Sequence, residues 1–131
     1  MQTERRRHVR YIPQGNSFAA LGEKYTKVGK IKDIGMGGLA FEYVVSQGNH
    51  GAGSKVDVFL TDDTFHIHNL PCLIVYDVGV SESQADSPPA DMLTFRRCAV
   101  RFTACSDEHK SQVRSFIKKH TVGKAEDRFT P

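Results

Sequence analysis

The sequence predicts a mainly β domain, a closed antiparallel barrel or a rolled sheet, followed by one C-terminal helix. Short segments with apolar residues at alternating positions recur along most of the chain, and turn residues that include 11 glycines and 5 prolines separate them. Apolar residues make up 39% of the 131 positions, which is enough for a single core. Near the end of the chain, the alternation is replaced by the spacing of an amphipathic helix.

The first half of the chain contains four segments that are predicted to be strands. They are residues 16–21, 25–33, 39–45 and 55–60. The last segment is the most regular, because Val56, Val58 and Leu60 fall on one face. The second alternates less cleanly, since Ile31 shares a face with Lys27. A glycine-rich corner is expected between the second and third segments, at residues 35–38.

Three further strands are expected in the second half, at 65–70, 73–80 and 92–104. Pro71 separates the first two of them, because proline cannot donate a backbone hydrogen bond. Residues 81–91 contain serine, aspartate and two prolines and are expected to form a mobile hairpin loop.

The last predicted element is a helix at about residues 106–121. Ser106 is placed to cap it, and acidic residues follow in the first turn, where the helix dipole favours negative charge. Val113, Phe116 and Ile117 share one face. We expect this apolar face to cover an end or a flank of the barrel.

These elements predict three regions: a flexible arginine-rich N-terminal segment at 1–13, the barrel with its helix at 14–123, and a disordered tail at 124–131. No stretch approaches the roughly 18 continuous apolar residues of a membrane helix, and the N-terminus lacks the apolar core of a secretory signal. The three cysteines form no CxxC pair, so neither a disulfide framework nor a zinc knuckle is indicated. We therefore expect a cytoplasmic protein with reduced thiols and no membrane insertion.

The positive charge of the chain is concentrated at its N-terminus. Residues 1–10 contain Arg5, Arg6, Arg7 and Arg10 and one glutamate, so their net charge of +3 equals that of the whole chain. A neutral body with one cationic segment differs from a protein that coats nucleic acid with a basic surface. By itself the arginine segment could be a solvated cationic tail or a nucleic-acid arm, and ligand binding is favoured only when the second motif is considered with it.

The arginine segment and the glycine-rich corner together suit a phosphorylated purine. Guanidinium groups bind phosphate oxygens and the O6/N7 edge of guanine through paired donors, and they stack on bases. Asp33 could accept hydrogen bonds from guanine N1–H and N2–H, or orient an arginine. Gly35 and Gly38 allow the backbone to approach a ligand closely.

The order and spacing of these segments resemble the PilZ domain family. Arg6 and Arg10 are similar to the family's RxxxR motif, and Asp33-x-Gly35-x-x-Gly38 is similar to its [D/N]xSxxG motif. Residues 96–102 resemble the family's late strand, and the predicted helix follows at the family's place. The resemblance covers most of the chain, and it implies a six-stranded antiparallel β-barrel with a C-terminal α-helix that binds cyclic di-GMP.

The resemblance also implies roles for individual residues. Arg6 and Arg10 would contact phosphate and guanine, Asp33 would bind guanine or a neighbouring arginine, and Gly38 would shape the turn. Arg5 resembles an additional arginine that in some members favours a stacked pair of ligands, and Arg7 belongs to the same binding segment. The protein would then be a non-catalytic receptor without a further cofactor. Its N-terminal segment would become ordered on binding and alter contacts with an effector protein.

One position departs from the family pattern, because Gly35 stands where the family has serine. A net hydrogen bond contributes about 0.5–1.5 kcal/mol, whereas a charge-assisted one contributes about 1.5–3 kcal/mol. The arginines should therefore decide whether binding occurs, and Gly35 should tune it. Two alternatives stay open: an adapter of the PilZ fold that binds no nucleotide and acts through protein partners, and a small nucleic-acid binder. The second predicts steep salt dependence, but the arginine segment lacks interleaved aromatic residues.

Other chemistry-bearing patterns are weak. His66-x-His68 places two imidazoles on one face of a strand, but no third ligand has convincing spacing, so no metal site is expected. Cys98 follows an arginine, yet its strand position favours burial over reactivity. No Ser/His/Asp or Cys/His arrangement is identifiable, and we expect no enzymatic activity.

Overall fold

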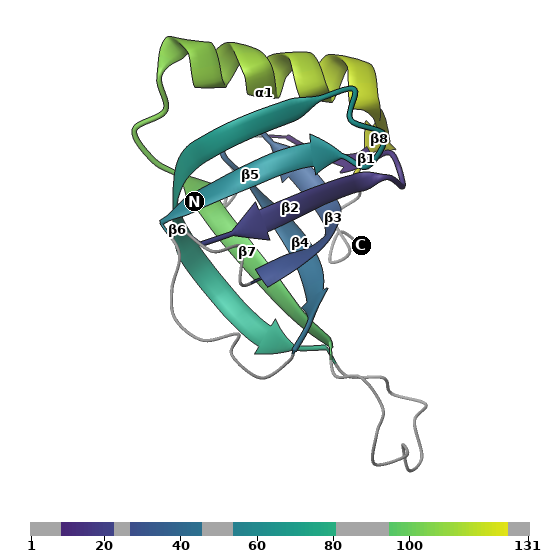
Figure 1. The fold of residues 1–131 in the computed structure, drawn as a ribbon, viewed down its shortest axis with the longest axis vertical. Helices are drawn as coiled ribbons and strands as arrows, with labels where there is room; N and C mark the ends of the chain where they lie inside the picture. The colour runs from purple at the N-terminus through teal and green to yellow at the C-terminus, as the bar shows by residue number, and fades with distance from the viewer. Residues whose placement is uncertain (1–8, 23–26, 46–53, 81–94, 126–131) are drawn as a thin grey trace, which may run out of the picture.

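The computed structural model describes residues 9–22, 27–45, 54–80 and 95–125, which form eight strands and one helix (Figure 1). The strands are β1 (Arg10–Pro13), β2 (Ser17–Leu21), β3 (Lys27–Gly35), β4 (Gly38–Val44), β5 (Lys55–Leu60), β6 (His66–Gly79), β7 (Phe95–Phe102) and β8 (Thr121–Lys124). The helix, α1, spans Asp107–His120. The predicted loop at 81–91 lies outside the described residues, as do Arg5, Arg6 and Arg7. Within these described ranges, no helix is long and apolar enough to cross a membrane.

Six of the strands close into an antiparallel barrel. Hydrogen-bonded neighbours follow the order β2-β5-β6-β7-β4-β3, and β2 also pairs with β3, which completes the ring. This confirms the mainly β class and the six-stranded barrel with a C-terminal helix. Closure pairs the edges that an open sheet would leave free. The remaining strands lie outside the ring, with β1 paired to β3 and β8 paired to β1.

The core lies inside this ring. Strand β5 shows the pattern most clearly, because Val56, Val58 and Leu60 are buried as their alternation predicts. In Figure 1, α1 lies across one end of the barrel. Its Val113 and Phe116 are buried and belong to the core cluster, so the helix closes that end with its apolar face.

The helix begins where the sequence predicts. The Ser106 hydroxyl oxygen accepts a hydrogen bond from the backbone N–H of His109 at 3.0 Å, which satisfies one of the free donors of the first turn. Asp107 and Glu108 occupy that turn, and basic residues occupy the last one.

Strand β6 runs through Pro71, although two separate strands were expected there. The carbonyl oxygen of Pro71 accepts a hydrogen bond from the Thr103 backbone N–H at 2.8 Å. The next residue, Cys72, donates its N–H to the Ser54 carbonyl at 2.8 Å. Proline removes only one donor from the strand, and the acceptors and donors around it keep the pairing continuous.

The ends of the described chain also differ from expectation. Arg10–Pro13 forms strand β1, where a flexible segment was predicted, and Lys124 ends strand β8, where a disordered tail was predicted to begin. The two strands pair with each other, with Tyr11 opposite Lys124. Each strand gives the other backbone partners that neither segment has on its own, and this mutual pairing is not visible in either sequence.

Candidate functional site

The turn between β3 and β4 forms the predicted glycine-rich corner. Gly35 and Gly38 are paired at its base, with Met36 and Gly37 between them. Asp33 precedes the corner on β3, just after a register shift that interrupts the regular alternation of the strand. The shift leaves the Asp33 side chain partly exposed beside the corner, so its carboxylate remains accessible.

Strand β1 brings the second predicted motif to the same place. Arg10 lies opposite Gly35 in the β1–β3 pairing, and its guanidinium donates from Nη1 to the Asp33 carboxylate Oδ1. Both side chains are 20% exposed. Two residues that are 23 positions apart in the sequence, one from each predicted motif, therefore form an ion pair at the surface.

The structure gives a physical reason for glycine at position 35. A Cβ atom on Gly35 would lie 2.4 Å from the carbonyl oxygen of Val9 and 3.2 Å from Cδ of Arg10. Only glycine allows β1 to pack this closely against the end of β3. Gly38 is equally constrained, because its Cβ would lie 2.2 Å from the Val100 carbonyl oxygen. The corner thus requires glycine at both positions, at Gly35 because of β1 and at Gly38 because of β7.

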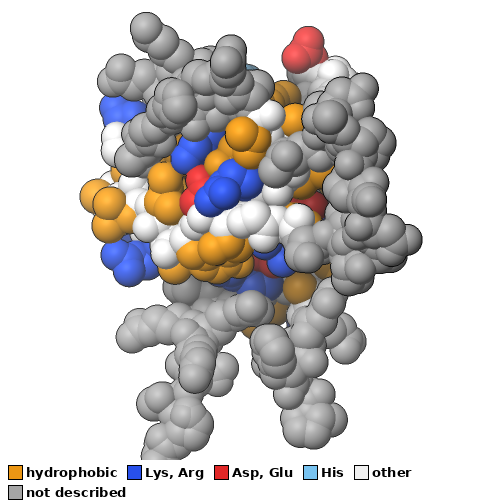
Figure 2. All heavy atoms as spheres, turned by 90° about the horizontal axis from the view of Figure 1, so that it is seen from below, with side chains coloured by type: hydrophobic (Ala, Val, Ile, Leu, Met, Phe, Trp, Pro, Cys, Tyr) orange, Lys and Arg blue, Asp and Glu red, His pale blue; other side chains and the backbone are white. Residues whose placement is uncertain are grey.

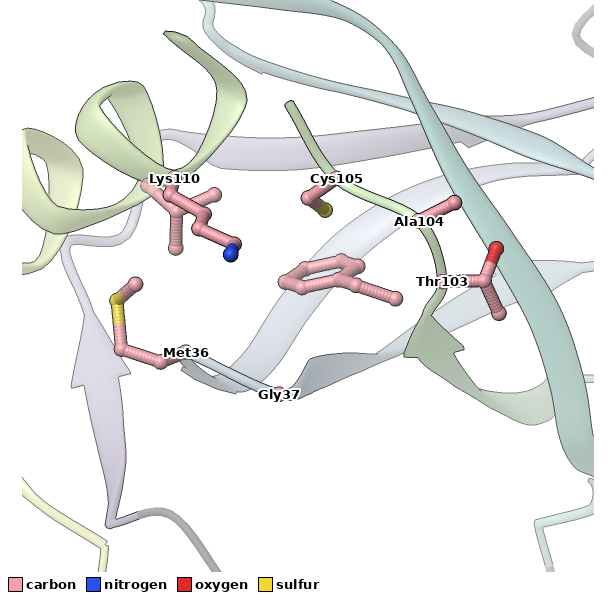
Figure 3. A pocket seen from close by; sticks show the side chains of 8 residues that line it. Met36, Gly37, Thr103, Ala104, Cys105 and Lys110 are labelled. Carbon is pink, nitrogen blue, oxygen red and sulfur yellow. The ribbon is translucent and has the colours of Figure 1, made fainter. Parts of the chain in front are cut away.

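A hollow lies beside the corner, between the β3–β4 turn and the connection from β7 to α1 (Figure 3). It is lined by Met36, Gly37, Phe102, Thr103, Ala104, Cys105, Lys110 and Val113. In Figure 3, Met36 faces it from the turn and Lys110 from the helix. Burial raises the pKa of the Cys105 thiol, so this lining group is a weak nucleophile near neutral pH. The lining combines apolar surface with one ammonium group.

One cationic residue beside the corner was missed in the sequence analysis. Arg101 of β7 lies opposite Gly38 in the β4–β7 pairing, and it is exposed. The signal available was its position in the late strand, five residues after Arg96. The three N-terminal arginines of the predicted site lie outside the described residues, so the structure brings together Arg10, Asp33 and the two glycines.

A second polar cluster lies at the opposite end of β3 and β4. The Asp77 carboxylate of β6 accepts hydrogen bonds from Lys27 Nζ at 2.9 Å, from Tyr43 Oη at 2.7 and 2.9 Å, and from Arg96 Nε at 2.8 Å. Arg96 also donates from Nη2 to the Asp77 carbonyl oxygen at 2.6 Å. Figure 2, seen from below Figure 1, shows acidic and basic side chains next to one another with apolar side chains around them.

The cluster shifts the pKa values of its members. Burial alone would favour the protonated acid at Asp77, but hydrogen bonds from Lys27, Tyr43 and Arg96 outweigh it and lower the pKa of Asp77. Burial, together with the hydrogen bond to Asp77, raises the pKa of Tyr43 to about 12. The carboxylate is thus held in its charged form and the phenol in its neutral form.

The chain belongs to the PilZ domain family, because the sequence profile of the PilZ domain matches residues 4–119. The fold agrees with this assignment. The PilZ domain of YcgR from Escherichia coli, with c-di-GMP, is similar with a TM-score of 0.60 and 14% identity, over 88% of this chain and 90% of that chain. No curated protein matches the sequence.

Two longer proteins share the fold. YcgR from Escherichia coli in complex with c-di-GMP is similar at 16% identity and a TM-score of 0.59, over 88% of this chain and 46% of that chain. The MrkH–c-di-GMP complex from K. pneumonia is similar at 13% identity and a TM-score of 0.62, over 86% of this chain and 51% of that chain. The chain therefore spans about half the length of these two proteins.

Proposed function

We propose that this chain is a receptor for cyclic di-GMP and that it binds the ligand at the β3–β4 corner. The observation that carries the proposal is the contact between Arg10 and Asp33 beside Gly35 and Gly38. The family assignment and the similarity to c-di-GMP complexes of YcgR and MrkH support the choice of ligand. The proposal is one of binding without a chemical step.

Asp33 and Arg10 offer complementary groups to guanine. The Asp33 carboxylate accepts hydrogen bonds from N1–H and N2–H, and the Arg10 guanidinium donates to O6 and N7 or to a phosphate. The pair is partly buried, with 20% of each side chain exposed, so both charged groups remain accessible to a ligand at the surface.

The other arginines of the segment lie three to five positions before Arg10. Arg6 is four positions before Arg10, and four extended residues span at most about 14 Å. Arg5, Arg6 and Arg7 are therefore close enough along the chain to reach a ligand held at the corner. We propose that they neutralise its phosphates and that the segment becomes ordered in doing so, which would change the surface offered to an effector protein. We place this signalling in the cytoplasm.

Arg101 and Lys110 extend the positive charge around the corner. Arg101 lies opposite Gly38 and Lys110 lines the adjacent hollow. A dianionic ligand that covers the corner would be attracted by both cations. They supplement the motif arginines, since neither belongs to the two motifs.

Isothermal titration calorimetry of the full chain with cyclic di-GMP tests the proposal, with GTP and cyclic di-AMP as controls. We expect saturable binding of cyclic di-GMP alone. Arg10→Ala should weaken it by about 10–100-fold, because a charge-assisted hydrogen bond contributes about 1.5–3 kcal/mol. Arg114→Ala, which removes an exposed arginine from α1, should leave the affinity unchanged.

Two results would overturn the proposal. Absence of binding by the wild-type chain would favour the adapter that acts through protein partners. Equal binding of any polynucleotide, with a steep loss of affinity in salt, would favour a nucleic-acid binder.

A further inference from the structure

We propose that Asp57, His66 and His68 form a binding site for a divalent transition-metal ion, with zinc as the ion that best fits the ligands. The three residues lie on neighbouring antiparallel strands, Asp57 on β5 and the two histidines on β6. One ligand atom from each, a carboxylate oxygen and two imidazole nitrogens, can be chosen so that all lie within 4.8 Å of one another. None of the three residues belongs to the nucleotide site proposed above.

The strand pairing explains why Asp57 lies there. Val56 is opposite Leu70 and Val58 is opposite Ile67, so the single residue Asp57 faces two residues of β6 across a register shift. Asn69, one of these two, adopts a positive φ of 57°, and its backbone N–H donates to Asp57 Oδ1 at 2.9 Å. A bulge of this kind turns side chains away from their regular directions.

The hydrogen bond from Asn69 fixes one carboxylate oxygen and leaves the other directed at the imidazoles. Asp57 Oδ2 lies 2.9 Å from His66 Nε2 and 3.4 Å from His68 Nδ1. The two imidazole rings are stacked, with centroids 3.7 Å apart and an interplanar angle of 19°. An ordinary aspartate–histidine ion pair needs one imidazole, whereas here two converge on the same oxygen.

The spacing suits zinc coordination. Ligands bound at 2.0–2.1 Å in a tetrahedral site lie about 3.4 Å from each other. The observed separations from the carboxylate oxygen, 2.9 and 3.4 Å, are near that value. Two histidines and one carboxylate are a donor set that zinc uses in sites that keep an open position.

The burial of the three residues suits an exchangeable ion. The Asp57 side chain is only 4% exposed, while those of His66 and His68 are 43% and 65% exposed. The hydrogen bond from Asn69 fixes the buried carboxylate, and the two more exposed imidazoles would rotate out of their parallel stacking to direct both nitrogens at one ion. Three protein ligands leave a position for water, so the ion is open to exchange with solvent.

Three contacts surround the proposed ligands. Asn69 orients the carboxylate, and the His66 ring packs against Phe59 with centroids 5.6 Å apart. His109 of α1 contacts the His68 carbonyl oxygen through Nε2 at 3.1 Å. A hydrogen bond to a ligating group, such as that from Asn69, fixes the orientation of the ligand, and its loss costs roughly 10–100-fold in metal affinity in known sites.

The test is titration of the metal-free full chain with Zn²⁺ by calorimetry and with Co²⁺ by visible absorption. We expect one Zn²⁺ per chain and a Co²⁺ spectrum without sulfur-to-cobalt charge transfer. His66→Gln and His68→Gln should each lower the affinity at least tenfold, since loss of a ligand costs more than loss of an outer contact. His68 is the safer variant for folding because it is the most exposed of the three.

Two matched controls separate this site from other metal-binding groups. His120→Gln removes an imidazole that packs on Phe65 and Phe116 instead of on the cluster, and Cys105→Ser removes the partly exposed thiol. Both variants should bind Zn²⁺ as the wild type does. The proposal is overturned if the wild-type chain binds no Zn²⁺, or if His68→Gln, folded by circular dichroism, binds it with unchanged affinity.

Discussion

Two aspartates at opposite ends of the barrel are almost equally exposed but differ in their surroundings. The side chain of Asp33 is 20% exposed and that of Asp77 is 17% exposed. The Asp33 carboxylate forms an ion pair with Arg10, whose side chain is also 20% exposed. Asp77 is bonded by the side chains of Lys27, Tyr43 and Arg96, and the Lys27 side chain is only 8% exposed.

The two contacts differ in the number and burial of the donors more than in the exposure of the carboxylate. Removing the Asp77 carboxylate would leave the buried Lys27 ammonium without its counter-charge, which lowers the stability of the fold. Withdrawing Asp33 would leave an arginine that water can still reach. We therefore expect the Asp77 cluster to contribute more to stability than the Arg10–Asp33 pair, which under the proposed function would exchange its contact for the ligand.

The largest expected effect is on the free energy of unfolding, when each of the two aspartates is replaced by asparagine. We expect Asp77→Asn to lower the free energy of unfolding by about 3 kcal/mol, because removing one partner of a buried pair leaves the other uncompensated. Asp33→Asn should change it by less than about 1 kcal/mol. Urea unfolding of the two variants measures both values. Equal losses of stability would show that the two carboxylates contribute equally to the fold.

The same pair of variants should behave in the reverse way toward the ligand. Asp33→Asn should weaken binding of cyclic di-GMP, because the amide no longer accepts two guanine N–H groups. Asp77→Asn should leave the affinity unchanged at temperatures where it is folded. Calorimetry measures the affinity of each variant for cyclic di-GMP. A loss of affinity in Asp77→Asn alone would indicate that the ligand binds at the Asp77 end of the barrel and not at the β3–β4 corner.

Gly35→Ser restores the serine of the family motif, yet we expect it to destabilise the chain. The new Cβ would lie 2.4 Å from the Val9 carbonyl oxygen, so β1 would have to shift. Overpacking of this kind costs about 1–3 kcal/mol. Gly35→Ala should have the same effect on urea unfolding, because the clash is with Cβ. Tighter binding of cyclic di-GMP by Gly35→Ser would instead show that β1 leaves Gly35 in the bound state.

The smallest expected effect concerns Tyr43 at alkaline pH. Its pKa is raised from 10.0 to about 12, by burial and by the hydrogen bond to Asp77. A raised pKa means that the contribution of Tyr43 to stability is complete below pH 10 and is lost as the pH rises toward 12. Phenolate absorbance of the wild type minus Tyr43→Phe should give a midpoint near 12. Tyr76→Phe, at an exposed site, serves as the control. A midpoint near 10 for Tyr43 would contradict the burial of its side chain and its hydrogen bond to Asp77.

Local signals in the sequence were sufficient for several elements. The alternation of Val56, Val58 and Leu60 predicted β5 with its actual bounds, and Ser106 marked the start of α1. The glycine-rich corner and Asp33 were also correctly placed together. Each of these features depends on residues within a few positions of one another, so a short window of sequence contains the whole physical cause.

Other features were predicted wrongly or missed because their cause is distant in the chain. Arg10–Pro13 became a strand because β3 pairs with it on one side and β8, more than 100 residues later, on the other. Strand β6 continued through Pro71 because the Ser54 carbonyl accepts a hydrogen bond from the Cys72 N–H and the Thr103 N–H donates to the Pro71 carbonyl. A single sequence window cannot show which segments will supply such partners.

The sequence by itself determined the class of fold, the alternation of the strands, the helix cap and the chemical character of the arginine segment. Only the tertiary structure decided which distant side chains meet. It placed Asp57 beside His66 and His68 through a register shift, and it buried Lys27 next to Asp77, 50 residues away. The physical reason is that alternation depends on neighbours in the chain, whereas contacts across strands depend on how the whole barrel closes.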